Sequence, residues 1–350
     1  MSMRVGVLTG GGDAPGLNAA ICGLARRLLA ANAELVGFAD GWRGLIEDAA
    51  RPLQHADFQH LLVYGGTLLG SRGDNPYRDA ATMVPKVLAT IARHRLDALV
   101  AIGGEGTLGA ADRLFTEHQV PVVGVPKTID NDLDATDFTF GFFSAVEVAT
   151  RAMDDLRSTA ESHGRVMVVE CMGRHAGWIT AYAGVAAGAE VVLVPERPVH
   201  VEELCQNLAR LRQAGARSAI VAVAEGARLH EDGKCLSSME KDEFGEYKTG
   251  GVAATIAKRV QAKMGWEARP VVLGHLQRAG KPIAFDRIFA LRLGARAARL
   301  VLERRFGYMA AMRAGDSVDV PLRAAVAARK TLTAQFLDRY ESFFMPIGGP

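Results

Sequence analysis

Short apolar runs alternate with longer amphipathic stretches from the beginning of the chain. The runs at Arg4 to Leu8, Glu34 to Phe38, Ala98 to Ile102 and Val122 to Val125 have the length and the bounding turn residues of buried strands. Between them, apolar residues recur at helical spacing from Leu17 to Ala31, Ala80 to His94 and Thr107 to His118. Strands that alternate with helices predict an α/β fold with a mainly parallel sheet.

A second block repeats this alternation. A long helix is predicted from about Phe143 to Ser162, and strands at Val166 to Glu170, Val191 to Val194 and Ala219 to Ala224. We therefore expect two lobes, with a boundary near Phe140. The polar and charged stretch from His230 to Gly251 is interpreted as an exposed loop or flap. Two closing helices are expected, at about Phe285 to Arg304 and Leu332 to Phe343.

Composition narrows the class of protein. The chain has 350 residues, 49% of them hydrophobic, which is enough for a sizeable core in about two lobes. With 41 basic and 39 acidic residues the net charge is +2, so no strong field favours nucleic acid or a membrane surface. The four cysteines form no CxxC pair, and no apolar stretch reaches the roughly 20 residues of a membrane span. We expect a cytoplasmic protein whose partners are small molecules or copies of itself.

Two glycine-rich turns follow predicted strands. The first, Thr9 to Asn18, reads Thr-Gly-Gly-Gly-Asp-Ala-Pro-Gly-Leu-Asn and matches neither a Walker A loop nor GxGxxG. Its glycines would let backbone amides approach a phosphate at a helix start, although a plain strand-to-helix turn is the alternative. The second is Gly103-Gly104-Glu105-Gly106-Thr107. Glu105 is either a ligand for Mg²⁺ or simply an acid that stabilises the first turn of the next helix.

A third turn, Pro126-Lys127-Thr128-Ile129-Asp130-Asn131-Asp132, combines a cation, a hydroxyl and two carboxylates directly after an apolar run. Phosphoryl transfer to an alcohol needs a carboxylate base, cations and Mg²⁺ on the phosphates. Asp130 and Asp132 can divide the two carboxylate tasks, while Lys127 and Thr128 offer an ammonium and a hydroxyl to the phosphates. The segment therefore predicts a phosphoryl-transfer site at a strand end.

Taken together, these turns resemble the bacterial type of the phosphofructokinase family. Two further segments carry the resemblance in the same order, Glu170-Cys171-Met172-Gly173-Arg174 and Leu273-Gly274-His275-Leu276-Gln277-Arg278-Ala279-Gly280. The similarity extends over about 300 residues. It implies two Rossmann-like three-layer lobes with an active site in the cleft between them. Residues 1–140 with about 277–327 would bind the phosphoryl donor, and residues 141–276 with about 328–350 would bind fructose 6-phosphate.

The resemblance also implies roles for individual residues. Asp130 would be the base that activates the sugar 1-hydroxyl, with Thr128 and Arg174 stabilising the transferring phosphoryl group. Glu105 and Asp132 would serve Mg²⁺. The sugar phosphate is assigned to Met172, Glu225, His275 and Arg278 of one subunit and to Arg165 and Arg269 of a neighbour. A site completed by a neighbour implies a homo-oligomer, either a dimer or, most simply, a homotetramer.

The donor-binding set implied by the resemblance is Gly11, Arg72, Gly104, Gly106, Thr107 and Lys127. Two of these positions point to different donors. Gly106 leaves room for the nucleotide of ATP where pyrophosphate-using members carry an acid, whereas Lys127 is typical of pyrophosphate-using members. Because exclusion decides specificity more firmly than one added attraction, we favour ATP. Arg72 stands one residue before the position of the family's phosphate-bridging arginine, which is Gly73 here, and Arg78 is an alternative.

Three hypotheses follow for the function of the chain. The first is an Mg²⁺-dependent 6-phosphofructokinase of glycolysis that uses ATP. The second is the same transfer with pyrophosphate as donor, and the third is a noncatalytic sugar-phosphate sensor of this fold. Because Asp130, Asp132 and Arg174 are all present, the third hypothesis is the weakest.

Overall fold

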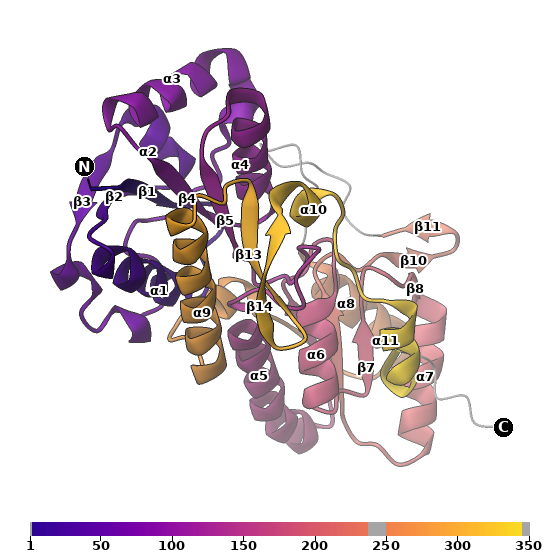
Figure 1. The fold of residues 1–350 in the computed structure, drawn as a ribbon. Helices are drawn as coiled ribbons and strands as arrows, with labels where there is room; N and C mark the ends of the chain where they lie inside the picture. Colours follow the sequence, from indigo (N-terminus) through magenta and orange to yellow (C-terminus); the bar gives the residue numbers. More distant parts are fainter. Residues whose placement is uncertain (1, 237–249, 345–350) are drawn as a thin grey trace. The chain divides into compact units, whose positions relative to one another are not determined.

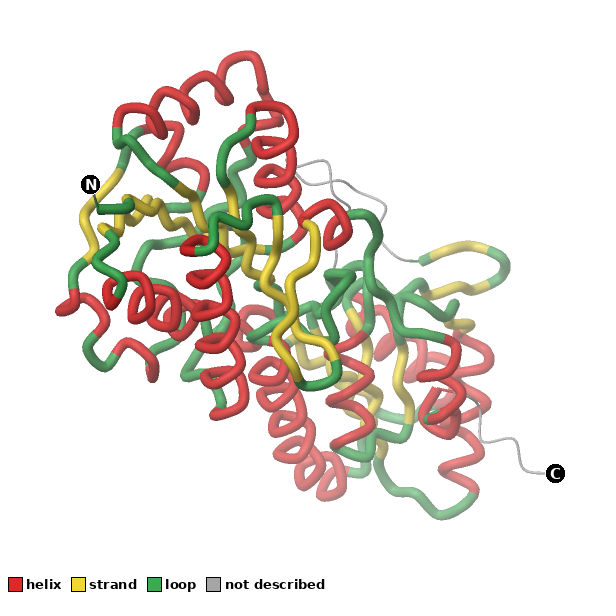
Figure 2. The backbone as a smooth tube through the Cα atoms, viewed as in Figure 1, coloured by secondary structure: helices red, strands yellow, loops and turns green. Residues whose placement is uncertain are grey.

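The computed structural model describes residues 2–236 and 250–344, which form two compact units (Figure 1). Of the described residues, those within 1–129, 133–144 and 278–329 form unit 1, and those within 130–132, 145–277 and 330–350 form unit 2. The chain therefore passes between the units several times, twice within the turn that carries the two aspartates. In each unit helices flank the strands, which are drawn in yellow in Figure 2.

Unit 1 contains a seven-stranded sheet in the order β14-β13-β5-β4-β1-β2-β3. Five neighbouring strands, from β13 to β2, are parallel, and the edge strands β14 and β3 are antiparallel. The bounds of the strands are β1 Arg4–Thr9, β2 Glu34–Phe38, β3 Ala50–Leu53, β4 Ala98–Gly103, β5 Val122–Pro126, β13 Tyr308–Arg313 and β14 Asp316–Pro321. The α-helices are α1 Leu17–Ala30, α2 Trp42–Glu47, α3 Ala80–Arg93, α4 Glu105–His118, α9 Ala284–Leu302 and α10 Leu322–Val326, and the 3₁₀ helices are η1 His55–Phe58, η2 Leu61–Val63 and η3 Pro76–Asp79.

The sheet of unit 1 is covered on both faces. Val100 and Ile102 of β4 join a core with α1 and α9, while Leu99 and Ala101, which alternate with them, join a second core with α2, α3, α4 and α10. Because successive side chains of a strand point to opposite faces, this division gives helix, sheet and helix layers. It also explains why the central strands are continuous apolar runs instead of alternating ones.

Unit 2 is built on a four-stranded parallel sheet in the order β12-β6-β9-β7. A separate three-stranded sheet has the order β11-β10-β8. The strands are β6 Val166–Cys171, β7 Val191–Leu193, β8 Val199–His200, β9 Ala219–Ala224, β10 Leu229–Glu231, β11 Lys234–Cys235 and β12 Ala268–Val272. The helices are α6 Trp178–Ala186, α7 Val201–Gln213, α8 Val252–Met264, η4 Gly274–Arg278, α11 Ala334–Arg339 and α12 Glu341–Phe344. Helix α5, Phe142–His163, begins in unit 1 and continues in unit 2.

Three details differ from the elements predicted from the sequence. Helix α4 begins at Glu105 instead of Thr107, so Glu105 and Gly106 lie in its first turn. The single helix expected from Leu332 to Phe343 is two short helices that are interrupted at Tyr340. The predicted loop from His230 onward begins instead with a hairpin of β10 and β11, and its central part, residues 237–249, lies outside the described residues.

A buried carboxylate fixes the start of α5 within unit 1. Asp286 of α9 is fully buried, and its Oδ2 accepts hydrogen bonds from the backbone nitrogen (2.7 Å) and the hydroxyl (2.6 Å) of Ser144. It thereby caps the first turn of α5 from a different helix. Burial raises the pKa of Asp286 above its usual range, and the Ser144 hydrogen bonds, which lower it, offset only part of that effect.

Candidate functional site

The site candidates of unit 1 lie at the carboxyl ends of β1, β4 and β5. Strand β1 is the point at which the sheet order changes direction, because β2 pairs on one side of it and β4 on the other. Loops at the carboxyl ends of strands at such a point form the usual ligand crevice of an open α/β sheet. The three motif turns predicted from the sequence follow these three strands, so the topology brings them to one edge.

The first glycine loop is held through both backbone groups of Gly11. Its nitrogen donates to the carbonyl of Arg72 (2.8 Å), and its carbonyl accepts from the hydroxyl of Ser71 (2.6 Å). Gly11 has a φ of 82°, a left-handed conformation that glycine adopts without strain. The side chain of Arg72 is 52% exposed and lies 3.7 Å from Asp74. The structure therefore shows a positional role for the Arg72 backbone, and a donor contact by its guanidinium stays a prediction.

Thr107 packs against both the first and the second glycine-rich turn. Its side chain is 5% exposed and occupies the space beside Gly10 and Gly103. A Cβ on Gly10 would lie 2.6 Å from the Thr107 hydroxyl, and a Cβ on Gly103 would lie 2.4 Å from Cβ of Thr107. Both glycines are therefore required for this packing. Thr107 was predicted to bind the donor, and its observed contacts are with the neighbouring backbone.

Gly106 faces open space. No atom lies within 4 Å of the position that a Cβ would take, and the residue is exposed in the first turn of α4. Its carbonyl accepts a hydrogen bond from the side chain of Asn75 (3.3 Å). Gly104 immediately precedes the helix as its N-cap, so the amides of this turn point out of a helix N-terminus.

Lys127 extends back beneath the first glycine loop. Its side chain is 3% exposed, and its ammonium donates a hydrogen bond to the carbonyl of Gly12. The Lys127 backbone nitrogen also donates to Gly103 (2.9 Å), so this residue touches both glycine turns. The hydroxyl of Thr139 donates to the carbonyl of Thr128 (2.6 Å) and steadies the next residue of the turn.

Arg278 also lies against Gly12. A Cβ on Gly12 would lie 1.8 Å from a terminal guanidinium nitrogen of Arg278, so a larger residue there would displace this guanidinium. Among the residues predicted to bind the sugar phosphate, Arg278 belongs to unit 1, whereas Met172, Glu225 and His275 belong to unit 2. A guanidinium beside the glycine loop is suited to a phosphate.

In unit 2 the candidates gather at the carboxyl ends of β6 and β9. The backbone nitrogen of Glu225 donates to Cys171 (2.8 Å), and that of Met172 donates to the side chain of Gln277 (3.2 Å). A Cβ on Gly226 would lie 2.0 Å from the carbonyl of Arg174, so a glycine is needed where these two turns meet. Met172, Arg174 and Glu225 are thus brought together by adjacent parallel strands.

Arg165 and Arg269 share one carboxylate at β12, which is an edge strand. Nε of Arg165 lies 2.9 Å from one oxygen of Glu267, and a terminal nitrogen of Arg269 lies 2.7 Å from the other. The hydrogen bond with Arg165 lowers the pKa of Glu267 most, and that with Arg269 lowers it further, so this pKa lies below its usual range. Both arginines are partly exposed, and their contact with a neighbouring subunit's site stays a prediction.

The two proposed Mg²⁺ ligands offer oxygen atoms of the right chemistry. Glu105 is 45% exposed, and its carboxylate lies 2.9 Å from Nε of Arg329. Asp132 is half-buried in unit 2. No group of three or more histidine, cysteine or acidic side chains suited to a metal occurs within residues 2–236 and 250–344. Mg²⁺ that is bound mainly by substrate phosphates and water needs only one or two carboxylates, so the residues present fit it.

Two residues that sequence reasoning missed contact the motif turns. Arg329 pairs with Glu105 in unit 1, and Lys330 binds the turn at Asn131 and Asp132 in unit 2. No motif marks this dipeptide, since its contacts lie about 200 residues away in the sequence.

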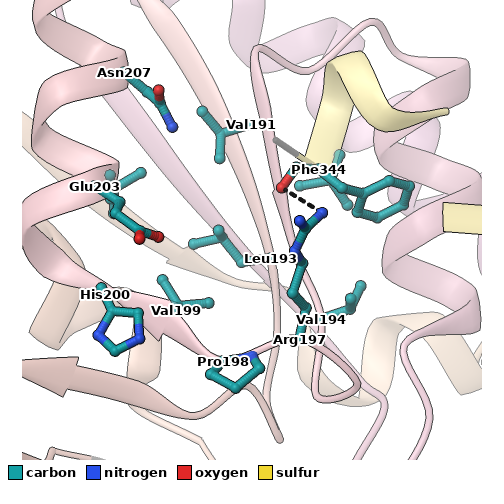
Figure 3. Close-up of a pocket in the computed structure, with 12 residues that line it drawn as sticks. Val191, Leu193, Val194, Arg197, Pro198, Val199, His200, Glu203, Asn207 and Phe344 are labelled. Carbon is teal, nitrogen blue, oxygen red and sulfur yellow. Dashed lines mark hydrogen bonds between the residues drawn. The ribbon is translucent and has the colours of Figure 1, made fainter. Parts of the chain in front are cut away.

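A cavity of about 70 Å³ lies in unit 2 among β7, β8 and α7 (Figure 3). Val191, Leu193, Asn207 and Phe344 are among its lining residues, and Arg197 donates to the carbonyl of Phe344 (3.4 Å). None of the candidate site residues lines it. Among the described helices, none is both long enough and apolar enough to cross a membrane.

Comparison with known proteins identifies the family. The sequence profile of the phosphofructokinases matches residues 4–301. The chain belongs to the phosphofructokinase family. The predicted family, the α/β fold and the prediction of a phosphotransferase are therefore confirmed.

Curated relatives of the chain carry two different donor names. The pyrophosphate–fructose 6-phosphate 1-phosphotransferase of Amycolatopsis methanolica is 50% identical over 343 residues, which cover 98% of this chain and 100% of that protein. The ATP-dependent 6-phosphofructokinase of Mycobacterium tuberculosis (strain H37Rv) is 46% identical over 344 residues, with the same coverage of both. Similarity to relatives therefore supports phosphofructokinase activity without choosing the donor.

Solved structures support the same fold. Phosphofructokinase of Pichia pastoris in the T-state matches with a TM-score of 0.80 and 32% identity, over 93% of this chain and 36% of that one. The pyrophosphate-dependent phosphofructokinase of Marinobacter aquaeolei matches with a TM-score of 0.83 and 22% identity, over 98% and 88% of the two chains. Because the identity to the Marinobacter aquaeolei protein is 22%, this similarity supports the fold alone.

Proposed function

We propose that this protein is an ATP-dependent 6-phosphofructokinase, which transfers the γ-phosphate of ATP to the 1-hydroxyl of fructose 6-phosphate. The observation that carries the proposal is the joining of three strand-end turns in unit 1, where Thr107 and Lys127 both pack on the first glycine loop. Backbone amides at a helix start, glycines that permit close approach, and nearby guanidinium and ammonium groups are what a polyphosphate requires.

Asp130 is the general base in this mechanism. It takes the proton of the sugar 1-hydroxyl as the oxygen attacks the γ-phosphorus, and the bond from that phosphorus to the bridging oxygen of ADP breaks. Thr128 and Arg174 donate hydrogen bonds to the transferring phosphoryl group, whose charge is spread over its outer oxygens. Glu105 and Asp132 would hold Mg²⁺, which when bound would neutralise charge on the donor phosphates.

The sugar phosphate is recognised by groups of matching chemistry. Guanidinium forks suit a 6-phosphate in two-point contact, and a glutamate with a histidine suits sugar hydroxyls. Arg278, Glu225 and His275 take these roles, and the family resemblance assigns Met172 to the same substrate. Arg165 and Arg269 are assigned to the site of a second copy, which implies a homotetramer or dimer. We also propose that the enzyme works in the cytoplasm, in glycolysis.

One observation favours ATP over pyrophosphate as the donor, and a second weakens the argument for pyrophosphate. Gly106 has open space around it, so neither bulk nor negative charge there excludes a nucleotide. Lys127, the residue that predicts pyrophosphate, is almost fully buried and donates to the Gly12 carbonyl. Its ammonium therefore stabilises the loop, which both donors would use in the same way.

A pyrophosphate-dependent fructose 6-phosphate phosphotransferase is the second candidate. Lys127 is typical of the pyrophosphate-using members that the chain resembles, and the relative from Amycolatopsis methanolica is named for that activity. It shares the acceptor, the base and the product with the first candidate, so only the donor separates them.

Product analysis tests the proposed activity. Purified protein with Mg²⁺, fructose 6-phosphate and either donor is expected to form fructose 1,6-bisphosphate, detected by phosphorus NMR and by aldolase-coupled NADH oxidation. Formation of that product with ATP supports the proposal. Absence of the bisphosphate with both donors, in protein shown to be folded by circular dichroism, supports the noncatalytic sensor instead.

A further inference from the structure

Lys330 makes two hydrogen bonds to consecutive residues of the acidic turn in unit 2. Its ammonium donates to Oδ1 of Asn131 (2.9 Å), and its backbone nitrogen donates to the carbonyl of Asp132 (2.9 Å). Asn131 directly follows Asp130, and Asp132 lies two residues after Asp130. A single residue near the end of the chain therefore holds the turn that carries both proposed catalytic carboxylates.

The turn depends on such support because of its backbone. Asn131 has a φ of 53° and is 1% exposed. Asparagine tolerates this left-handed conformation better than most residues, but the conformation still costs free energy unless the surroundings hold it. A buried carboxamide oxygen also needs a donor, and the Lys330 ammonium provides a charge-assisted one.

Lys330 is itself held by the start of α6. Its carbonyl accepts from the indole nitrogen of Trp178 (3.0 Å), and the Trp178 ring packs edge-on against Phe336 (5.5 Å between centroids). Two residues further on, the nitrogen of Leu332 donates to Glu196 (3.0 Å). The Glu196 carboxylate also accepts from Gly177, the N-cap of α6, at 3.0 and 3.1 Å.

Residues 330–332 thus contact the surroundings of two candidate catalytic residues, Asp130 and Arg174. Residues 330–332 are bonded to the turn of Asp130 on one side and to the N-terminus of α6 on the other. Gly177 follows Arg174 by three residues, so the start of α6 closes the loop on which Arg174 stands. All of these contacts lie within unit 2.

We propose that Lys330 is a positioning residue for phosphoryl transfer, which fixes the Asp130–Asp132 turn relative to the loop of Arg174. The proposal rests on the proposed function for its kinetic consequence. A displacement of about 1 Å in a catalytic group costs on the order of a hundredfold in rate, so a loosened turn lowers kcat. Binding of fructose 6-phosphate depends on other residues and changes little.

The test is a double-mutant cycle between Lys330 and Asn131. Lys330→Met keeps the aliphatic stem and removes the ammonium, while Asn131→Gly keeps the left-handed backbone and removes the carboxamide. Each single variant is expected to lower kcat by about 10- to 100-fold with KM for fructose 6-phosphate changed by less than about threefold. The double variant is expected to lose no more than the worse single variant, because both changes remove the same bond.

Two further variants calibrate the cycle. Lys330→Arg keeps a cationic donor and is expected to recover most of the lost kcat. Lys263→Met is the matched control, since Lys263 pairs with Glu202 on the surface of the same unit, and it is expected to keep full activity. Unchanged kcat in Lys330→Met, or fully additive losses in the double variant, would overturn the proposal.

Hydrogen exchange separates this proposal from the proposed function. Amide exchange of a peptide covering residues 126–134 is expected to be at least several-fold faster in Lys330→Met than in the wild type, while a peptide covering residues 166–171 of β6 is unchanged. Equal exchange in the first peptide overturns the tether even if the enzyme is active. Should wild-type protein form no product with either donor, the proposed function fails, while faster exchange still supports the tether.

Trp178→Phe gives the same readouts if Lys330→Met does not fold. It keeps an aromatic ring against Phe336 and near the Lys330 ammonium, which lies 5.7 Å from the Trp178 ring centroid, and it removes the hydrogen bond to the Lys330 carbonyl. A loss of about two- to tenfold in kcat with faster exchange of residues 126–134 is expected, since one hydrogen bond is removed. Wild-type kcat and exchange in this variant would contradict the proposal.

Discussion

The ammonium of Lys127 donates a hydrogen bond to the carbonyl of Gly12, which is 115 residues earlier in the chain. This bond joins the turn after β5 to the glycine loop after β1. The bond changes the role expected for Lys127, because a buried cation bonded to the backbone stabilises the loop before any donor is present. The identity of the donor then depends more on Gly106 than on Lys127.

Lys127→Met is expected to lower the free energy of unfolding by about 1–3 kcal/mol, since the Gly12 carbonyl loses a buried donor. Urea denaturation followed by circular dichroism measures this change. We also expect kcat/KM to fall for ATP and pyrophosphate alike, because both donors would use the same loop. Wild-type stability combined with a selective loss of pyrophosphate use would show that Lys127 acts as a donor ligand instead.

Gly106→Asp is expected to lower kcat/KM for ATP at least about tenfold, which corresponds to about 1.4 kcal/mol of repulsion between the new carboxylate and the nucleotide phosphates. Folding should be unaffected, because the position is open and an acid in the first turn of a helix is favourable. Gly109→Asp is the matched control in the same helix, since a Cβ there also meets no atom within 4 Å. Equal losses in the two variants would contradict the proposed position of the donor.

Asp130→Asn is expected to lower kcat by about 10²- to 10⁴-fold, because a carboxamide cannot accept the proton of the sugar hydroxyl. KM for fructose 6-phosphate should change by only a few-fold, which marks a loss specific to the transition state. Steady-state kinetics of the coupled reaction measure both. Asp134→Asn is the control, since Asp134 is exposed and its carboxylate accepts a hydrogen bond from the adjacent backbone nitrogen of Ala135 (2.8 Å). A kcat near the wild-type value in Asp130→Asn would refute the assignment of the base.

Asp286 predicts a pH dependence of stability. Its pKa is raised by burial, so the folded protein binds this proton more tightly than the unfolded chain does. Its contribution to stability is therefore full below about pH 3.9, the usual pKa of aspartate, and falls as the pH rises toward the folded value. Asp286→Asn lacks this titration. Urea titrations at pH 4, 5, 6 and 7 measure the free energy of unfolding of both proteins. The value for the wild type minus that for the variant should decrease as the pH rises. An increase with pH would contradict this account.

Local patterns were sufficient to predict the central elements. The apolar run at Val122 to Val125 became β5, Val122–Pro126, and the helix expected from Phe143 to Ser162 became α5, Phe142–His163. A buried parallel strand and a long amphipathic helix each have a strong periodicity of their own. Their positions therefore depend little on the rest of the chain.

Elements defined by distant partners were missed. Strand β13, Tyr308–Arg313, pairs with β5, which lies more than 180 residues earlier, and its sequence Met-Ala-Ala-Met suits a helix as well as a strand. Strand β3 contains Arg51 and Pro52, a composition that only an edge position tolerates.

The candidate site residues were predicted because several motifs occur in one order. Their local environments could not be predicted, since the burial of Lys127 and the packing of Thr107 on Gly103 depend on strands that meet only in the fold. Arg329 and Lys330 carry no motif, and only their contacts with Glu105 and Asn131 mark them.

The central claim is most directly tested by measuring kcat/KM for ATP and for pyrophosphate on one preparation of the wild-type protein. Fructose 6-phosphate and Mg²⁺ are held at saturation, and fructose 1,6-bisphosphate is detected as product with each donor. The account predicts that kcat/KM for ATP exceeds that for pyrophosphate at least about tenfold, or about 1.4 kcal/mol. A higher value for pyrophosphate would contradict it and would identify the second candidate as the function.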